Sequence, residues 1–136
     1  MKKNKGQGFT LFELLVSISI IAILTVVAIV SYSNAQKKAR DARRIQDVDA
    51  VGKALEQYYA DNTKYPDDIN DLVVGDYIQQ LPASIKTGYD FSYSLIDETN
   101  SCYCSKMEDQ ARGNSTSANC DIGPAGDYYC RKGQQE

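Results

Sequence analysis

An uncharged apolar run from Leu14 to Val30 most constrains how this chain of 136 residues can fold. The run contains neither Pro nor Gly, so nothing in it interrupts a helix. With its flanking residues it is long enough to span a bilayer, which requires about 20 apolar residues. We therefore predict a membrane-spanning helix over residues 9–32.

Glu13 lies at the start of this run, behind a short leader, residues 1–8, that contains three lysines. Placing a carboxylate in a membrane helix costs on the order of 3 kcal/mol, so such a group usually has a partner. Cleavage between Gly8 and Phe9 would create an ammonium group on Phe9, on the same helix face as Glu13 and about 6 Å from it along the axis. We expect Glu13 to pair with the Phe9 amine of a neighbouring copy. Pairing within the same chain is the alternative.

Charge is distributed unevenly along the chain. Residues 37–44, which we call the basic segment, hold five basic side chains and one acidic one. From Ile45 onward, sixteen acidic residues stand against seven basic ones. This distribution predicts attraction between the acidic part of one copy and the basic segment of another, or else a solvated basic face beside the membrane. An acidic head does not favour nucleic acid as a partner.

The residue types present favour disulfides and no enzymatic activity. The chain has no histidine, which excludes Ser-His-Asp triads, Cys-His pairs and histidine metal sites. Its cysteines are Cys102, Cys104, Cys120 and Cys130. An even number of cysteines behind a membrane segment indicates disulfides in an oxidising compartment. On a strand, Cys102 and Cys104 would face one side and bind different partners, although the pairing stays open.

Two other roles for the cysteines are weaker. A zinc site favours closely spaced cysteine pairs on both sides, whereas Cys120 and Cys130 lie ten residues apart. A Cys-x-Cys redox pair rests on Cys102 and Cys104 alone, which is a weak signal.

The helical pattern continues beyond the apolar run as an amphipathic segment over residues 33–61. Apolar side chains recur there at steps of three and four residues: Ile45, Val48, Val51, Leu55, Tyr58 and Tyr59. The helix should end near Asn62, which accepts the left-handed conformation, before Pro66 disfavours helix in the residue ahead of it. The single apolar stripe predicts packing against a small globular head, residues 62–136.

The head shows one short helical pattern and three strand candidates. A helix should begin with Asp67 or Asp68 as its cap and end at Gly75, followed by an extended segment over residues 77–82. Residues 89–95 alternate between apolar or aromatic and polar side chains, which indicates a half-buried strand. The remaining predictions are a hairpin partner over residues 101–107, a polar loop over 109–127 and a third strand over 127–131.

The N-terminal residues resemble those of type IV prepilins and type II secretion pseudopilins. The specific resemblance rests on the lysines ahead of Gly8, on Phe9-Thr10-Leu11 and on Glu13 in register; a looser one covers residues 31–66. It implies that a prepilin peptidase cuts between Gly8 and Phe9 and N-methylates Phe9, and that Glu13 is the glutamate used in assembly. It also implies an α+β fold, with a long N-terminal α-helix, membrane-spanning in its first half, packed on a small antiparallel β-sheet with a disulfide-bearing C-terminal region.

The resemblance further implies a structural role, as a pilin in a helical homo-oligomeric surface filament. The expected partners are the prepilin peptidase, the pilus or secretion assembly platform and the inner membrane. The precursor would cross the cytoplasmic membrane once with its leader inside, and the mature chain would form the extracellular filament. The main alternative is the major pseudopilin of a type II secretion system, although the disulfide-bearing tail favours a pilin. A secreted domain cut after Ala35 is a further alternative, but the apolar run exceeds the roughly 7–15 residues of an ordinary signal peptide.

Two features depart from what the resemblance implies. Many pilins carry a helix-disrupting Pro or Gly in the membrane half, and this chain has neither between Phe9 and Tyr32. We therefore expect no kink or melted turn there. The basic segment also carries more positive charge than the leader, against the tendency of basic residues to stay in the cytoplasm. We keep the leader inside because the cysteines need an oxidising compartment.

We predict no cofactor, with calcium as the alternative. Secretion pseudopilins often bind calcium through carboxylates of head loops. The oxygen ligands that the polar loop offers are Asp109, Asp121, Asp127, Asn114 and Asn119. Their spacing matches no ligand pattern, so a solvated loop is the simpler interpretation.

Overall fold

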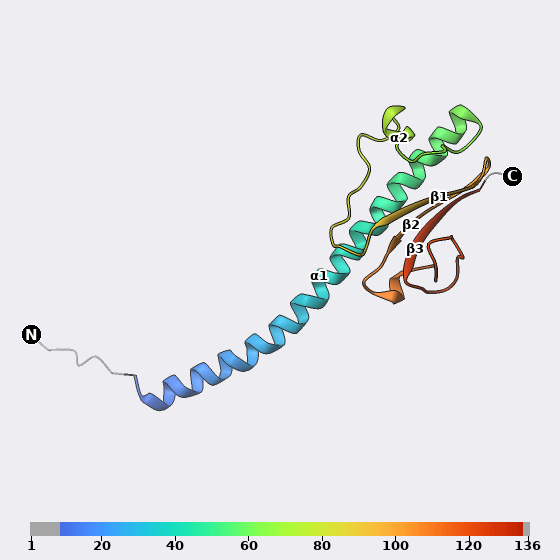
Figure 1. Cartoon of the computed structure of the whole chain (residues 1–136). Helices are drawn as coiled ribbons and strands as arrows, with labels where there is room; N and C mark the ends of the chain where they lie inside the picture. Colours follow the sequence, from blue (N-terminus) through green and yellow to red (C-terminus); the bar gives the residue numbers. More distant parts are fainter. Residues whose placement is uncertain (1–8, 135–136) are drawn as a thin grey trace, which may run out of the picture. The chain divides into compact units, whose positions relative to one another are not determined.

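The computed structural model describes residues 9–134. Its elements are helix α1 (Leu11–Asn62), helix α2 (Asp71–Val74), strands β1 (Phe91–Asp97) and β2 (Asn100–Lys106), the 3-10 helix η1 (Gln110–Arg112) and strand β3 (Tyr128–Gln134) (Figure 1). A long N-terminal helix with a small antiparallel sheet is the α+β fold expected from the sequence. The predicted leader, residues 1–8, which includes Gly8 of the predicted cleavage site, lies outside the described residues.

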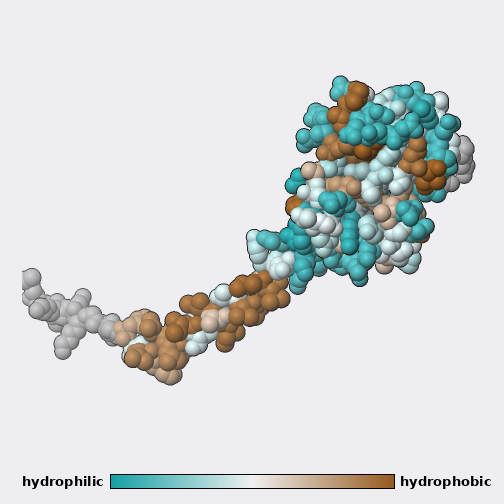
Figure 2. Space-filling view, viewed as in Figure 1, coloured by the Kyte–Doolittle hydropathy of each residue, from teal (hydrophilic) through white to brown (hydrophobic). Residues whose placement is uncertain are grey.

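The chain divides into two compact units, the first ending at Gln36 and the second beginning at Lys37, and α1 contributes to both. In the first unit, every described side chain is exposed. Figure 2 shows this part of α1 as an almost continuous apolar surface. Among the described residues, α1 is the one helix that is long and apolar enough to cross a membrane, judged by length and composition.

The few polar side chains in the apolar run are satisfied within the helix. Ser17, Ser19 and Thr25 each donate a hydroxyl hydrogen bond to the backbone carbonyl four residues earlier, at 2.7–2.8 Å. Such bonds remove the cost of placing a hydroxyl in an apolar environment. Apolar surface of this extent needs lipid or other apolar helices to cover it.

In the second unit, α1 packs on one face of a three-stranded antiparallel sheet with strand order β1-β2-β3 (Figure 1). Val48, Val51 and Leu55 of α1 form the core with Tyr103 of β2. These are stripe positions predicted from the helical period. Burying each such side chain stabilises the fold by about 2 kcal/mol.

Several elements differ from the sequence prediction. Strand β1 begins and ends two residues later than predicted, and β3 continues to Gln134 instead of ending at residue 131. Helix α1 ends at Asn62, but Thr63, with φ 59°, takes the left-handed conformation and donates its N–H to the Tyr59 carbonyl at 2.7 Å. Helix α2 begins only at Asp71, because Asp68 Oδ1 accepts the Asn70 N–H at 2.9 Å and so organises the preceding turn. Residues 77–82 contain bends and no strand, so the predicted extended segment is wrong.

Candidate functional site

Thr10 and Glu13 form a capping box at the start of α1. Glu13 Oε2 accepts hydrogen bonds from the Thr10 N–H at 2.9 Å and from Thr10 Oγ1 at 2.8 Å. The Glu13 N–H in turn donates to Thr10 Oγ1 at 3.2 Å. This reciprocal pair satisfies donors that every helix leaves unpaired at its N-terminus. The Thr-x-x-Glu spacing signals this motif, and sequence reasoning that considered only the charge of Glu13 missed it.

The capping box fixes the position of the carboxylate. Both contacts from Thr10 reach Oε2, and within residues 9–134 no donor contacts Oε1. Phe9, directly before the capping residue, has a side chain that is 77% exposed. The start of α1 therefore holds the Glu13 carboxylate through one oxygen and leaves Oε1 without a donor among the described residues.

A buried ionic cluster lies inside the second compact unit, which begins at Lys37 and which we call the head unit. Glu108, in the loop after β2, has a side chain only 2% exposed. It accepts two hydrogen bonds from Arg40, at 2.6 Å from Nε and 2.8 Å from Nη2, and a further one from Lys86 Nζ at 2.9 Å. Arg44 Nη1 adds a contact at 3.2 Å. The paired bonds from Arg40 are the fork geometry that makes Arg–carboxylate contacts strong.

Asp41 ties the same loop to α1 through its backbone. Its side chain is fully buried and accepts the N–H groups of Glu108 at 3.0 Å and Asp109 at 2.9 Å. It also accepts a hydrogen bond from Arg44 Nη1 at 2.7 Å. The Arg44 guanidinium lies 4.8 Å from the ring centre of Tyr89, where the aromatic face offers a cation–π contact.

The cluster shifts the acid-base equilibrium of Glu108. Hydrogen bonding by Arg40, aided by Lys86 and Arg44, holds the pKa of the Glu108 carboxyl far below its ordinary value and outweighs the opposing effect of burial. The carboxylate therefore stays ionised across the physiological range.

The basic segment is consequently less basic at the surface than its composition suggests. Arg40 and Arg44 are engaged by Glu108 inside the head unit, whereas Lys37, Lys38 and Arg43 remain exposed. The i,i+3 spacing of Asp41 and Arg44 was visible in the sequence. Glu108 was not foreseeable as their partner, because only tertiary packing brings it to α1.

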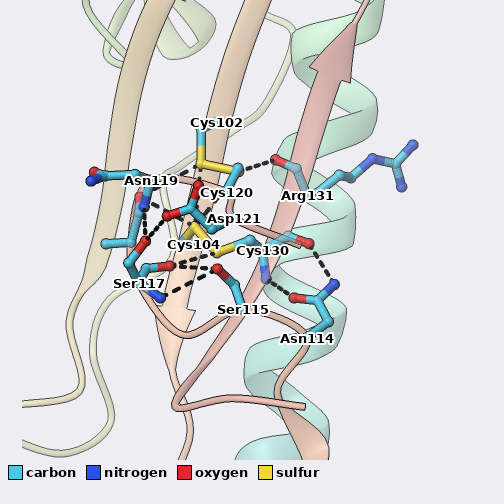
Figure 3. Close-up of a disulfide and its surroundings, with 11 residues drawn as sticks. Cys102, Cys104, Asn114, Ser115, Ser117, Asn119, Cys120, Asp121, Cys130 and Arg131 are labelled. Carbon is cyan, nitrogen blue, oxygen red and sulfur yellow. Dashed lines mark hydrogen bonds between the residues drawn. A yellow bond between two sulfur atoms is a disulfide. The ribbon is translucent and has the colours of Figure 1, made fainter. Parts of the chain in front are cut away.

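Two adjacent disulfides lie on the sheet face opposite α1 (Figure 3). Cys102 pairs with Cys120 and Cys104 with Cys130, and no cysteine is free. This confirms that the two cysteines of β2 have different partners, while Tyr103 between them points to the core. Within the described range, these four are the only group of three or more His, Cys, Asp or Glu side chains close enough to hold a metal ion, and their sulfurs are joined as disulfides.

Three of the five candidate calcium ligands make other side-chain contacts. Asp109 Oδ1 accepts the Ala111 N–H at 3.2 Å and so caps η1. The Asn114 side chain bonds both the N–H and the carbonyl of Cys130, at 2.7 and 2.9 Å, and acts as a short strand partner for β3 (Figure 3). Asp121 accepts from Ser117 Oγ at 2.9 Å. Calcium binding stays an alternative that needs a binding measurement.

Comparison with known proteins places these features in a family. A model described as the prokaryotic N-terminal methylation motif matches residues 3–29. The type IV wide pilus major component PilA4 of Thermus thermophilus is 32% identical over 102 residues, which cover 74% of this chain and 72% of that protein. The chain belongs to the family of type IV pilins and type II secretion pseudopilins.

Other members of the pilin family match a shorter part. Type II secretion system core protein G of Aeromonas hydrophila is 35% identical over 66 residues, 48% of this chain and 46% of that protein. Type IV major pilin protein PilE1 of Neisseria gonorrhoeae is 31% identical over 83 residues, 61% of this chain and 48% of that protein. The matched region thus spans about half the length of these relatives. No solved structure matches.

Replacing Asp41 by alanine should destabilise the head by about 3 kcal/mol, because Arg44 and two backbone N–H groups would lose their buried acceptor. Chemical denaturation of the full chain in detergent, followed by near-UV circular dichroism of the tyrosines and disulfides, measures this. Asp49→Ala on the same helix is the matched control. Asp49 contacts Arg131 at 3.7 Å and is partly exposed, so its loss should cost less than about 1 kcal/mol. Equal losses would refute the special role of Asp41.

Acid should weaken the head through Glu108. Because its folded pKa lies below the ordinary value of 4.5, its contribution is complete above about pH 4.5 and is lost as the pH falls towards the folded pKa. The free energy of unfolding of Glu108→Gln should therefore vary less than that of the wild type between about pH 4.5 and 2. Glu98→Gln, which removes an exposed carboxylate, should follow the wild-type curve. Parallel wild-type and Glu108→Gln curves would contradict the assignment.

Proposed function

We propose that this chain is the structural subunit of a type IV pilus-like surface filament. The observation that carries the proposal is the extent of the match to the wide pilus component, 102 residues, which continues into the head unit. The precursor would hold the first half of α1 in the cytoplasmic membrane with the head outside. Prepilin peptidase would cut between Gly8 and Phe9 and methylate Phe9.

Glu13 would set the register of assembly. The capping box holds Oε2 on Thr10, and the new Phe9 ammonium of a neighbouring subunit would pair with the carboxylate. In a lipid or helix-bundle environment this attraction is much stronger than at a water-exposed surface, and an unpaired carboxylate is strongly disfavoured. The exposed apolar residues of the first unit would then bundle as the filament core.

A role as the major pseudopilin of a type II secretion system is the second candidate. The observation that favours it is that several relatives, from Aeromonas hydrophila to Escherichia coli, are type II secretion system core protein G. Their matches cover 63–67 residues, less than half of this chain. Long surface fibres on cells that express the chain would favour the pilus, and secretion defects without fibres would favour the pseudopilus.

The mature N-terminus decides whether prepilin processing occurs. Intact mass and peptide sequencing of the protein from its membrane fraction should show a chain that starts at N-methylated Phe9. A chain that starts at Gln36 would instead identify a secreted domain with an ordinary signal peptide, and the assembly role of Glu13 would be wrong.

Variants of Glu13 separate its charge from its capping role. Glu13→Ala should abolish or misregister filaments while leaving cleavage intact. Glu13→Gln keeps a side chain that can complete the capping box but removes the charge. We expect it to fail like Glu13→Ala, as judged by sheared filament yield and electron microscopy.

Thr10→Ala is the converse control, because it removes the capping hydroxyl and keeps the charge. It should retain filaments at reduced yield. Normal filaments from Glu13→Gln together with a loss in Thr10→Ala would show that Glu13 acts as a helix cap, and pairing with Phe9 would be ruled out.

A further inference from the structure

The head unit carries exposed positive charge at the end where its part of α1 begins. Arg112 of η1 donates from Nη1 to the Lys38 carbonyl at 2.8 Å, which brings a further cation to this end. We call this surface the basic end; its residues are Lys37, Lys38, Arg43 and Arg112. The buried cluster beside it adds to the positive charge, because its three cations exceed its two carboxylates by one. Asp47 and Asp109, both partly buried, offset only part of this charge.

Negative charge gathers at the other end of the same helix segment. Residues 61–76 and 97–98 together contain seven acidic residues and one basic residue. The Tyr65 N–H donates to the Glu98 carbonyl at 3.0 Å, which joins the β1–β2 turn to the end of α1. We call this surface the acidic end; its exposed carboxylates are Asp61, Asp67, Asp68, Asp76, Asp97 and Glu98. Lys64, which pairs with Asp67 at 3.7 Å, is the one cation in these segments.

The two ends cannot neutralise each other within one molecule. Lys38 and Asp61 are separated by about 35 Å along α1, given the rise of about 1.5 Å per helical residue. At physiological salt the screening length is about 8 Å. The field of each end therefore acts on other molecules.

We propose that the acidic end of one head docks on the basic end of the head of a second copy. A second copy is the occupant that both surfaces fit, since the acidic end of one copy complements the basic end of another. A head-to-tail contact that repeats without closing into a ring generates an open filament, which is the assembly proposed above. The inference rests on the proposed filament and names a contact in it that is independent of Glu13.

Charge reversal and its compensation test the contact in cells that assemble the full chain. Lys37→Glu with Lys38→Glu should lower the sheared filament yield about tenfold, because attraction across each contact becomes repulsion. Asp67→Lys with Asp68→Lys should do the same. Combining all four changes should restore most of the yield, which a merely unfolded head could not show. As a control, Lys53→Glu reverses one exposed charge on α1 outside both ends and should leave the yield unchanged.

Salt gives a second readout on purified wild-type filaments. Raising the salt from about 0.1 M to about 1 M shortens the screening length from about 10 Å to about 3 Å and should increase release of subunits. Filaments insensitive to both the reversals and salt would overturn the contact while the proposed function stands. A failure to restore the yield in the fourfold variant would also overturn it. Absence of any wild-type filament would instead overturn the proposed function, and the contact with it.

Discussion

The head depends on a buried carboxylate, Asp41, that holds the backbone of the loop after β2 against α1. A buried ion pair adds little net stability over an apolar pair of equal size, but removing one partner leaves an uncompensated charge and is costly. Arg40, Arg44 and Glu108 complete the set of partners at short distances. The cluster therefore specifies one position of the sheet along the helix, which the apolar stripe alone would leave free to slide by a turn.

The two faces of the sheet are stabilised in different ways. The face towards α1 buries the core around Val51 and Tyr103, which is modest for a domain of this size. Among residues 9–134, no helix layer covers the opposite face, which carries the two disulfides that tie the loop and β3 to β2. Cross-links of this kind restrict the unfolded chain and compensate for a small core. Asn114 also ties the loop to β3, because its side chain hydrogen-bonds the backbone N–H and carbonyl of Cys130 at the strand edge.

Periodic features were predictable from the sequence, and contacts distant in the sequence were not. The stripe from Val48 to Leu55, the alternation around Tyr93 and the different partners of Cys102 and Cys104 follow from the helix and strand periods. The partnership of Arg40 with Glu108 arises only when the loop after β2 folds onto α1, and no local pattern encodes it. The capping box of Thr10 and Glu13 was predictable from the Thr-x-x-Glu spacing, but the sequence prediction considered only the charge of Glu13. The sequence prediction placed the left-handed conformation at Asn62, because Asn tolerates it. In the structure the next residue, Thr63, adopts it and donates its N–H to the Tyr59 carbonyl.

The capping of α1 by Glu13 is compatible with the intersubunit pairing proposed for the same side chain. Two hydrogen bonds from Thr10 satisfy one carboxylate oxygen and hold the side chain in a single orientation. They do not remove the charge, so the cost of placing it in an apolar environment persists until a cation arrives. A carboxylate that is already positioned loses less conformational freedom when it binds that cation. The cap would thus favour the proposed pairing with a neighbouring amine, because it already positions the carboxylate that the amine would contact.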